Sequence, residues 1–153
     1  MASTTATWSS DKYAPPSFNG AGEHHENALF QFDVAIIDEA GQLTIPAILG
    51  ALRFAKRFIL VGDEKQLPPL VLSKEAADAG LVESLFSILK RRDNDYTKID
   101  AHTASSCVSL KVQYRMNRWI SHFASRIFYD GQLIPHVSIA PSTLRSLPRR
   151  IKS

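Results

Sequence analysis

Two short apolar runs that each end in acidic residues constrain the fold of this chain more than any other feature. The first run, 32–37 (FDVAII), is rich in β-branched residues and is followed by Asp38 and Glu39. The second run, 58–61 (FILV), ends in a glycine and then Asp63. Runs of this length and composition are typical of buried strands in a parallel sheet. We therefore expect two neighbouring strands that both end in carboxylates.

The residues between these runs predict the connection. An apolar stripe at helical spacing follows Pro46 and reaches 54–55, so we expect a helix that begins at the proline. Strand, helix and strand at this spacing indicate a βαβ unit and an α/β fold, with a parallel sheet and flanking helices. Further along the chain we expect helices at 79–92 and 117–128, a strand at 108–112 and a loop at 93–106.

Composition excludes several classes of protein. The chain is 44% hydrophobic and 22% charged, which is typical of a globular domain and not of a disordered or fibrous chain. The single Cys107 cannot form an internal disulfide, and no apolar stretch approaches the roughly 20 residues of a membrane span. Residues 1–27 are rich in Ser, Thr, Pro and Gly, so we expect a disordered leader there.

The formal net charge of +3 is unevenly distributed. Residues 1–100 carry an excess of acidic side chains, whereas Asp130 is the only acidic residue in 101–153. A basic C-terminal third is compatible with binding to nucleic acid. It is also compatible with a solvated surface that ends in a basic tail, and charge alone favours that simpler interpretation.

The acidic strand ends suggest nucleotide chemistry. In open α/β sheets, ligands bind outside the carboxyl ends of the strands. Asp38 could hold Mg²⁺, which prefers hard oxygen ligands, and Glu39 could polarise an attacking water. The alternative is that the two carboxylates only cap the following helix.

The segment 62–69 (GDEKQLPP) after the second strand is more specific. Gly62 permits a tight turn, Gln66 offers both a donor and an acceptor to a phosphate or a water, and two prolines stiffen the loop. The alternative, an ordinary proline-rich turn, leaves the combination of acid, amide and Pro-Pro unexplained.

A third segment, 113–117 (QYRMN), adds a cation and an aromatic ring. Arg115 could stabilise charge on a transferred phosphoryl group, and Tyr114 could stack on a base. Without context, Tyr114 and Met116 are more often core residues, and Arg115 is more often part of a surface ion pair.

In order and spacing, the three segments resemble motifs of the superfamily 1 helicases. Residues 38–42 resemble the Walker B motif (motif II), 61–69 resemble motif III, and 113–117 resemble motif IV. The Gln-Tyr-Arg-Met form is typical of the branch that contains the nonsense-mediated-decay helicase, senataxin and the replication helicase–nuclease. Residues 52–55 (LRFA) are most similar to the helicase–nuclease. The resemblance covers about residues 28–133.

The resemblance implies a RecA-like P-loop NTPase fold that uses ATP and Mg²⁺. By its motifs, Asp38 would coordinate Mg²⁺ and Glu39 would activate water. Gln66 would sense the γ-phosphate and couple it to nucleic acid. Asp63 belongs to the same nucleotide-binding motif, with a less defined role.

The resemblance also divides the chain. Residues 28–106 would be the C-terminal part of the first RecA-like lobe, and 107–153 would open the second lobe and end in the basic tail. From that second lobe, Arg115 would contact the γ-phosphate and Tyr114 would lie against the adenine.

The sequence departs from the family pattern in what it lacks. No G-x-x-x-x-G-K-[ST] occurs in it, and neither do the upstream adenine-binding Gln motif or motifs V and VI. We therefore interpret the chain as a fragment or a truncated gene model and expect little ATP turnover from it alone, since the P-loop normally cradles the triphosphate. Cys107 alone cannot ligate an iron–sulfur cluster.

Two functions from different classes follow. The first is an ATP-dependent helicase acting on single-stranded nucleic acid, with DNA favoured over RNA and the nucleus as the favoured compartment, while cytoplasm and mitochondrion stay open. The alternative is a non-catalytic helicase remnant that binds a partner or nucleic acid.

Overall fold

The computed structural model describes residues 2–8, 32–100 and 104–139, and it divides the chain into two compact units. The first unit is Met1–Ser105 and the second is Ser106–Ser153. This division lies one residue before the start of the second segment predicted from the sequence.

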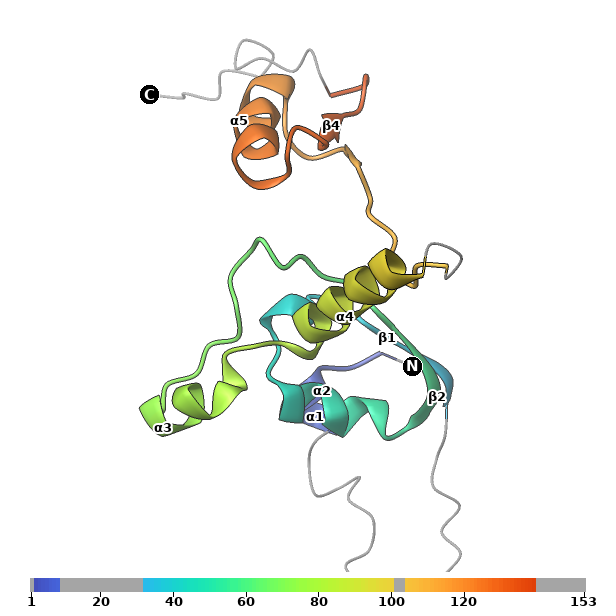
Figure 1. Cartoon of the computed structure of the whole chain (residues 1–153), viewed down its shortest axis with the longest axis vertical. Helices are drawn as coiled ribbons and strands as arrows, with labels where there is room; N and C mark the ends of the chain where they lie inside the picture. The colour runs from blue at the N-terminus through green and yellow to red at the C-terminus, as the bar shows by residue number, and fades with distance from the viewer. Residues whose placement is uncertain (1, 9–31, 101–103, 140–153) are drawn as a thin grey trace, which may run out of the picture. The chain divides into compact units, whose positions relative to one another are not determined.

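The first unit is built on a two-stranded parallel sheet (Figure 1). Strand β1 (Phe32–Ile37) pairs with β2 (Ala55–Leu60), and helix α2 (Ile45–Leu52) connects them. The predicted βαβ unit is confirmed, and β1 has the predicted bounds. The second strand begins at Ala55 rather than at Phe58. Helix α2 already ends at Leu52, so the residues from Ala55 onward can pair with β1.

The core of this unit lies on one face of the sheet. Three residues are buried there, namely Ile37, Ala40 and Ile48. Helix α2 and the start of helix α4 (Leu85–Ile99) pack against them. The partly buried contacts include Leu60, Leu85 and Phe86.

The opposite face of the same sheet is exposed. Because side chains alternate along a strand, Val34, Ile36, Ile59 and Val61 point away from the core. Their exposed fractions lie between 40% and 69%. The expectation of buried strands is therefore wrong for this face, since the described core lies on the other side.

A short helix from the predicted leader packs on this unit. Helix α1 (Thr5–Trp8) places the Trp8 ring edge-on to Phe32, with 5.6 Å between ring centroids, and 5.7 Å from the Phe54 ring. Arg53 also donates a hydrogen bond to the Trp8 carbonyl at 3.2 Å. The remainder of the predicted leader, 9–27, lies outside the described residues.

The predicted helix 79–92 is wrong at its start. The chain instead forms α3 (Lys74–Ala76) and a π-type turn, η3 (Ala77–Leu81), in which Gly80 has a φ of 93°. This left-handed conformation breaks the helical path. A new helix then begins after Ser84, whose Oγ accepts a hydrogen bond from the Ser87 amide at 3.1 Å.

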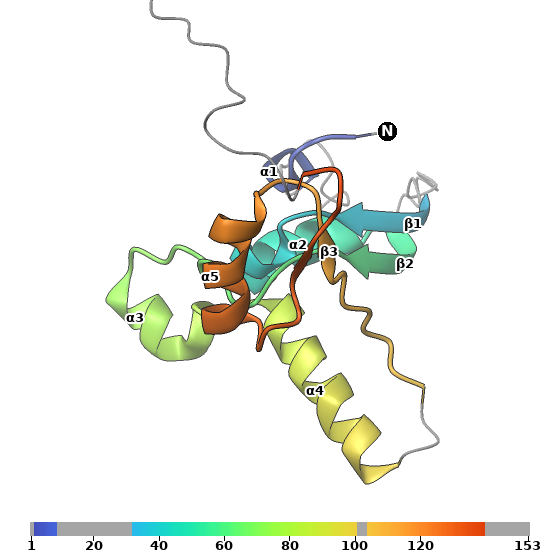
Figure 2. The same ribbon diagram turned by 90° about the horizontal axis from the view of Figure 1, so that it is seen from above.

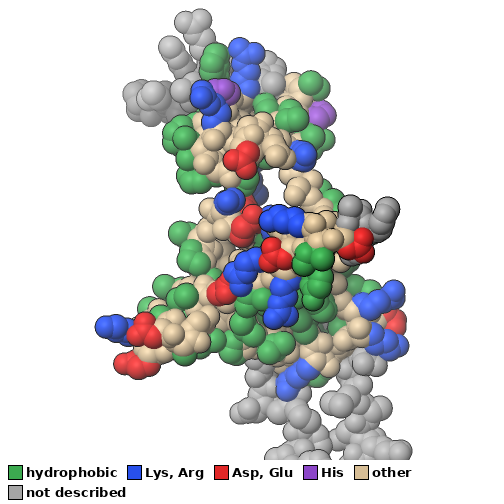
Figure 3. Space-filling model, viewed as in Figure 1, with side chains coloured by type: hydrophobic (Ala, Val, Ile, Leu, Met, Phe, Trp, Pro, Cys, Tyr) green, Lys and Arg blue, Asp and Glu red, His purple; other side chains and the backbone are tan. Residues whose placement is uncertain are grey.

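Helix α4 also extends beyond its predicted end, to Ile99, so the loop predicted at 93–106 is wrong over 93–99. These residues carry no apolar stripe, which is why the pattern indicated a loop. They form a polar helix whose surface shows charges of both signs (Figure 3). None of the described helices is long and apolar enough to cross a membrane.

The described residues of the second unit form one helix and two very short strands. Figure 2 shows the helix and the first of these strands, labelled α5 and β3. Strand β3 (Val112–Gln113) pairs in parallel with β4 (Ile134–Pro135), and α5 (Arg118–Phe128) lies between them in the sequence. The predicted helix 117–128 is confirmed, and Asn117 caps it through its side-chain oxygen. The predicted strand 108–112 is wrong, because pairing is limited to the two residues opposite β4.

Helix α5 turns its small polar residues inward. Ser121 and Ser125 are buried, and the Ser125 hydroxyl accepts a hydrogen bond from the Leu133 amide at 3.1 Å. The apolar stripe of the helix faces solvent instead, with exposed fractions of 59–69% at Trp119, Ile120, Phe123 and Ile127. The returning chain therefore packs against the serine side of α5.

Candidate nucleotide site

The loops that follow β1 and β2 lie against each other at the carboxyl edge of the sheet. The Val61 amide donates to the Ile37 carbonyl at 2.8 Å, and the Ala40 amide donates to the Val61 carbonyl at 2.9 Å. These hydrogen bonds continue the parallel pairing beyond the strands. The acidic residues at 38–39 and at Asp63 therefore leave the sheet at the same edge, as the sequence predicts.

Two glycines make this close approach possible. A Cβ on Gly41 would come within 3.0 Å of the Asp63 carbonyl oxygen, and a Cβ on Gly62 would come within 2.9 Å of the Gly41 nitrogen. The φ of Gly62 is not positive, so the tight-turn role predicted for it is wrong. Gly62 is needed instead because the other loop's backbone occupies the space of a side chain.

Asp38 and Glu39 are both exposed at this edge. Glu39 has a left-handed backbone (φ 53°), and its amide donates to Asp38 Oδ1 at 2.9 Å. Gln42 Nε2 donates to Glu39 Oε2 at 3.1 Å. Neither carboxylate caps η2 (Ala40–Gln42), and the residue preceding α2 is Thr44, so the alternative role of helix capping is wrong.

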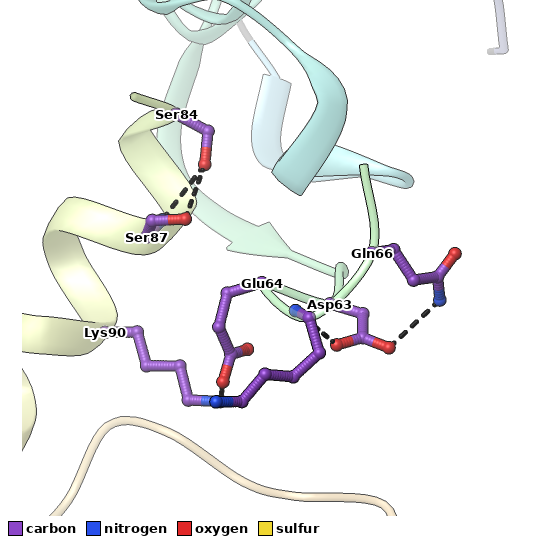
Figure 4. Close-up of polar contacts among 7 residues, drawn as sticks. Asp63, Glu64, Gln66, Ser84, Ser87 and Lys90 are labelled. Carbon is purple, nitrogen blue, oxygen red and sulfur yellow. Dashed lines mark hydrogen bonds and ion pairs between the residues drawn. The ribbon is translucent and has the colours of Figure 1, made fainter. Parts of the chain in front are cut away.

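The loop after β2 is organised by Asp63. Its Oδ1 accepts from the Lys65 amide at 2.9 Å, and its Oδ2 accepts from Gln66 Nε2 at 3.0 Å. Figure 4 shows the amide oxygen of Gln66 pointing away from this carboxylate. Gln66 is exposed, so that oxygen remains available as an acceptor.

A small cavity of about 230 Å³ lies between this loop and the start of α4. Asp63 and Gln66 line it, together with the buried Pro69 and the capping residue Ser84. Neither Asp38 nor Glu39 is among its lining residues. The cavity therefore adjoins the loop after β2 rather than the carboxylates after β1.

One ion pair joins helix α4 to the loop after β2, and a second lies at the start of the helix itself. Lys90 Nζ lies 2.7 Å from Glu64 Oε1, with both side chains about three-quarters buried, and Figure 4 shows this contact joining α4 to the loop. Arg91 pairs with Glu83 on the cavity wall. The hydrogen bond from Arg91 holds the pKa of the Glu83 carboxyl below its ordinary value, and the same bond raises the pKa of Arg91.

In the second unit, the Gln113 side chain shapes the loop that carries Arg115. Gln113 Oε1 accepts from the amides of Arg115 (2.9 Å) and Met116 (2.7 Å), and its Nε2 donates to the Met116 carbonyl at 2.7 Å. Arg115 is exposed and makes no ion pair with the described residues, so the surface ion pair considered for it is wrong. Its guanidinium is available for a ligand.

Tyr114 is 63% exposed, so its placement in a core is also wrong. Its ring stacks on His136, with 4.4 Å between ring centroids and 28° between the ring planes. Met116, by contrast, is half-buried.

The predicted site residues thus fall into two groups. Asp38, Glu39, Asp63 and Gln66 share one sheet edge in the first unit. Tyr114 and Arg115 share one loop in the second unit.

The sequence did not predict two residues that support Tyr114 and Arg115, namely Gln113 and His136. Gln113 was visible as part of the motif, although its side-chain role depends on a loop geometry that the pattern does not reveal. His136 follows a two-residue strand and carries no local signal at all.

The donor set at the sheet edge fits magnesium in its chemistry. Asp38 and Glu39 offer exposed carboxylate oxygens, the hard ligands that Mg²⁺ prefers. Within the described ranges no group of three or more His, Cys, Asp or Glu side chains is placed to hold a metal ion. Water and phosphate oxygens would have to supply the remaining ligands, as is usual for magnesium bound with a nucleotide.

Comparison with protein families defines the class of domain that carries this site. Two family models, each described as an AAA domain, match the chain at residues 18–74 and 81–152. The first match contains the loops after β1 and β2, and the second contains the Tyr114–Arg115 loop.

Individual relatives point to the same class. The chain is 46% identical over 102 residues to the mouse DNA replication ATP-dependent helicase/nuclease DNA2. It is 39% identical over 117 residues to the hamster (Mesocricetus auratus) DNA-binding protein SMUBP-2. These alignments cover 67% and 76% of this chain but 9% and 11% of the relatives, so the chain spans about a tenth of their length.

The fold and the two family matches define an α/β domain of the AAA type. More narrowly, the chain belongs to the superfamily 1 helicases, in the branch of the replication helicase–nuclease. Its parallel strands and flanking helices are part of the RecA-like P-loop NTPase fold of that family, as the motifs predicted.

Proposed function

We propose that the chain carries part of the ATP site of a nucleic-acid helicase. The observation that supports this most is the direct contact between the loops after β1 and β2, which brings two acidic segments and Gln66 to one sheet edge. Ligands of open α/β sheets bind at such edges.

Asp38 and Glu39 would have different roles at this sheet edge. Asp38 would be the protein ligand for Mg²⁺, which neutralises charge on the phosphates when bound with ATP. Glu39 would orient and polarise the attacking water. The Gln42 side chain holds the Glu39 carboxylate through one oxygen, which restricts its orientation.

Gln66 would sense whether the γ-phosphate is present and couple its presence to the rest of the lobe. Its amide nitrogen is held by Asp63, and its oxygen is free to accept from a water or a protonated group near the phosphate. Asp63 would therefore act as a positioning residue. The Lys90–Glu64 ion pair would transmit a shift of this loop to α4.

Residues 107–153 would contribute from the second lobe of the helicase. Arg115 would stabilise negative charge on the γ-phosphate, as an arginine finger does, and Tyr114 would stack on the adenine. Gln113 would keep the loop in the required shape through its three hydrogen bonds.

The favoured substrate is single-stranded DNA, and the favoured compartment is the nucleus. The relatives named for DNA replication and DNA binding support this choice. We infer that the 153 residues are a fragment of a helicase and hydrolyse little ATP alone, since no G-x-x-x-x-G-K-[ST] occurs among them.

A second candidate function is a non-catalytic module that binds a partner or nucleic acid. The exposed apolar side chains on the sheet and on α5 favour it, because patches of this kind mark interaction surfaces.

Titration of the full chain with a fluorescent ATP analogue and Mg²⁺ tests the proposal. We expect saturable binding that the double variant Asp38→Asn, Glu39→Gln loses. Asp33→Asn is the matched control, because Asp33 lies at the other end of β1 in an exposed pair with Lys56 (3.0 Å). Binding that all three proteins share, or that none shows, would favour the non-catalytic module.

A further inference from the structure

Tyr114 and His136 occupy equivalent positions in the second unit. Each is the first residue after a strand of the parallel pair β3 and β4. The His136 amide donates to the Gln113 carbonyl at 2.9 Å, so the register that pairs the strands also brings the two rings together. Both side chains therefore leave the carboxyl end of this small sheet, where ligands of parallel sheets bind.

The two rings differ in how firmly they are held. The His136 ring is half-buried, and its Nδ1 accepts from the Ser138 amide at 3.2 Å and lies 2.8 Å from the Ser138 hydroxyl. Because Nδ1 accepts the amide proton, the neutral ring carries its own proton on Nε2. Ser138 thus fixes the plane of the His136 ring.

The Tyr114 ring rests on this fixed plane and is 63% exposed. One face of the Tyr114 ring is covered by His136. A flat aromatic ligand therefore has to stack from the other side. Because His136 already restricts the Tyr114 ring, that ring loses little conformational freedom when a ligand binds, and this favours affinity.

We propose that His136 is a positioning residue that backs Tyr114, so that the adenine base completes a three-ring stack. This inference rests on the proposed nucleotide-binding function and adds to it a residue outside the three motifs. Stacking uses the faces of the base and not its edges. The Tyr114–His136 pair would therefore recognise the adenine ring and not the phosphates of the nucleotide.

Adenosine is the suitable probe, because it contains the base and no phosphate. The measurement is the change in the NMR signals of the Tyr114 and His136 rings as adenosine is added to the full chain. We expect saturable shifts at both rings. His136→Ala should weaken adenosine binding by about three- to tenfold, the size expected for one aromatic contact.

Three variants separate stacking from a general loss of structure. His136→Phe keeps a ring and should bind within about twofold of the unchanged chain. Ser138→Ala removes the hydroxyl contact to Nδ1 but keeps the bond from the Ser138 amide, so it should weaken binding less than His136→Ala does. His122→Ala, an exposed histidine on α5, should have no effect. The amide signals of Gln113 and Met116 report whether the loop itself is intact in each variant.

The outcomes are distinct. If adenosine leaves the Tyr114 signals unchanged, or if His136→Ala binds like the unchanged chain, the inference is overturned. Shifts produced by a thymidine oligonucleotide but not by adenosine would also overturn it, since the base would then belong to nucleic acid. If adenosine binds as expected while Mg²⁺–ATP binds no tighter, the inference stands and the proposed ATP site fails.

Discussion

Gly62 lies so close to Gly41 that a Cβ at position 62 would sit 2.9 Å from the Gly41 nitrogen. The atom in the way is backbone and cannot rotate aside. We expect Gly62→Ala to push the two loops apart, to destabilise the first unit by about 1–3 kcal/mol and to weaken nucleotide binding. Chemical denaturation and the ATP titration measure these two effects.

Gly80→Ala is the matched control for that substitution. Nothing lies within 4 Å of a Cβ at Gly80, although its φ of 93° makes alanine costly there by about 1–2 kcal/mol. Both variants should therefore lose stability, but only Gly62→Ala should lose nucleotide affinity. Equal affinity in the two variants would contradict the role given to the loop contact.

Gln113 should be the residue that keeps the Arg115 loop in shape. Gln113→Ala removes three hydrogen bonds to the backbone of 115–116 and should cost about 1–3 kcal/mol within the second unit. Amide hydrogen exchange at Arg115 and Met116 should become faster. Gln132→Ala, an exposed glutamine of the same unit, should leave these amides unchanged, and a loop equally protected in both variants would refute the prediction.

The Glu83–Arg91 pair predicts a pH dependence of stability. Arg91 lowers the pKa of Glu83 in the folded chain, so the pair stabilises the fold above the ordinary pKa of 4.5. The stabilisation is lost as the pH falls from about 4.5 through the lower folded pKa. Because both groups are exposed, the effect should be small and sensitive to salt.

Thermal melting measures this effect. Glu83→Gln should melt below the unchanged chain at pH 7, and the gap should close at pH 3. Asp78→Asn, which removes an acidic side chain outside any ion pair of the described residues, should show no such convergence. A gap of constant size across this range would count against the pair.

Asp63 should control where the Gln66 side chain points. Asp63→Ala removes the acceptors for Lys65 and Gln66 and should cost about 1–2 kcal/mol. Nucleotide affinity should fall even where the chain is fully folded, because Gln66 is no longer held at the sheet edge. Glu64→Ala is a useful comparison, since it breaks the contact to Lys90 and leaves Gln66 in place.

Local sequence patterns predicted the parts of the fold that depend on short-range rules. The apolar run of β1 and the helical pattern of α5 were sufficient to define those elements, and the acidic strand ends correctly indicated one shared sheet edge. The patterns failed at three elements, each for its own reason. Gly80 interrupts a helical stripe, the polar end of α4 has no stripe, and β3 is limited by the length of its partner.

The proposed site residues follow the same division. Asp38, Glu39, Gln66 and Arg115 stand in recognisable motifs, so the sequence alone proposed them. The sequence predicted Gly62 as a turn residue, whereas the structure requires it because the backbone of Gly41 lies close by. The nearness of another backbone segment is not visible in a single sequence. His136 could not be found, since its position depends on a two-residue strand that pairs across the whole of α5.

The central claim is that ATP and its metal ion bind at the edge formed by the loops after β1 and β2. Paramagnetic broadening with Mn²⁺–ATP in place of Mg²⁺–ATP tests it most directly. The account predicts that the amide signals of Asp38, Glu39 and Gln66 broaden first, while those of Asp33 and Lys56 at the other end of the sheet stay sharp. Broadening that begins at Asp33 and Lys56, or that spreads evenly over the chain, would contradict it.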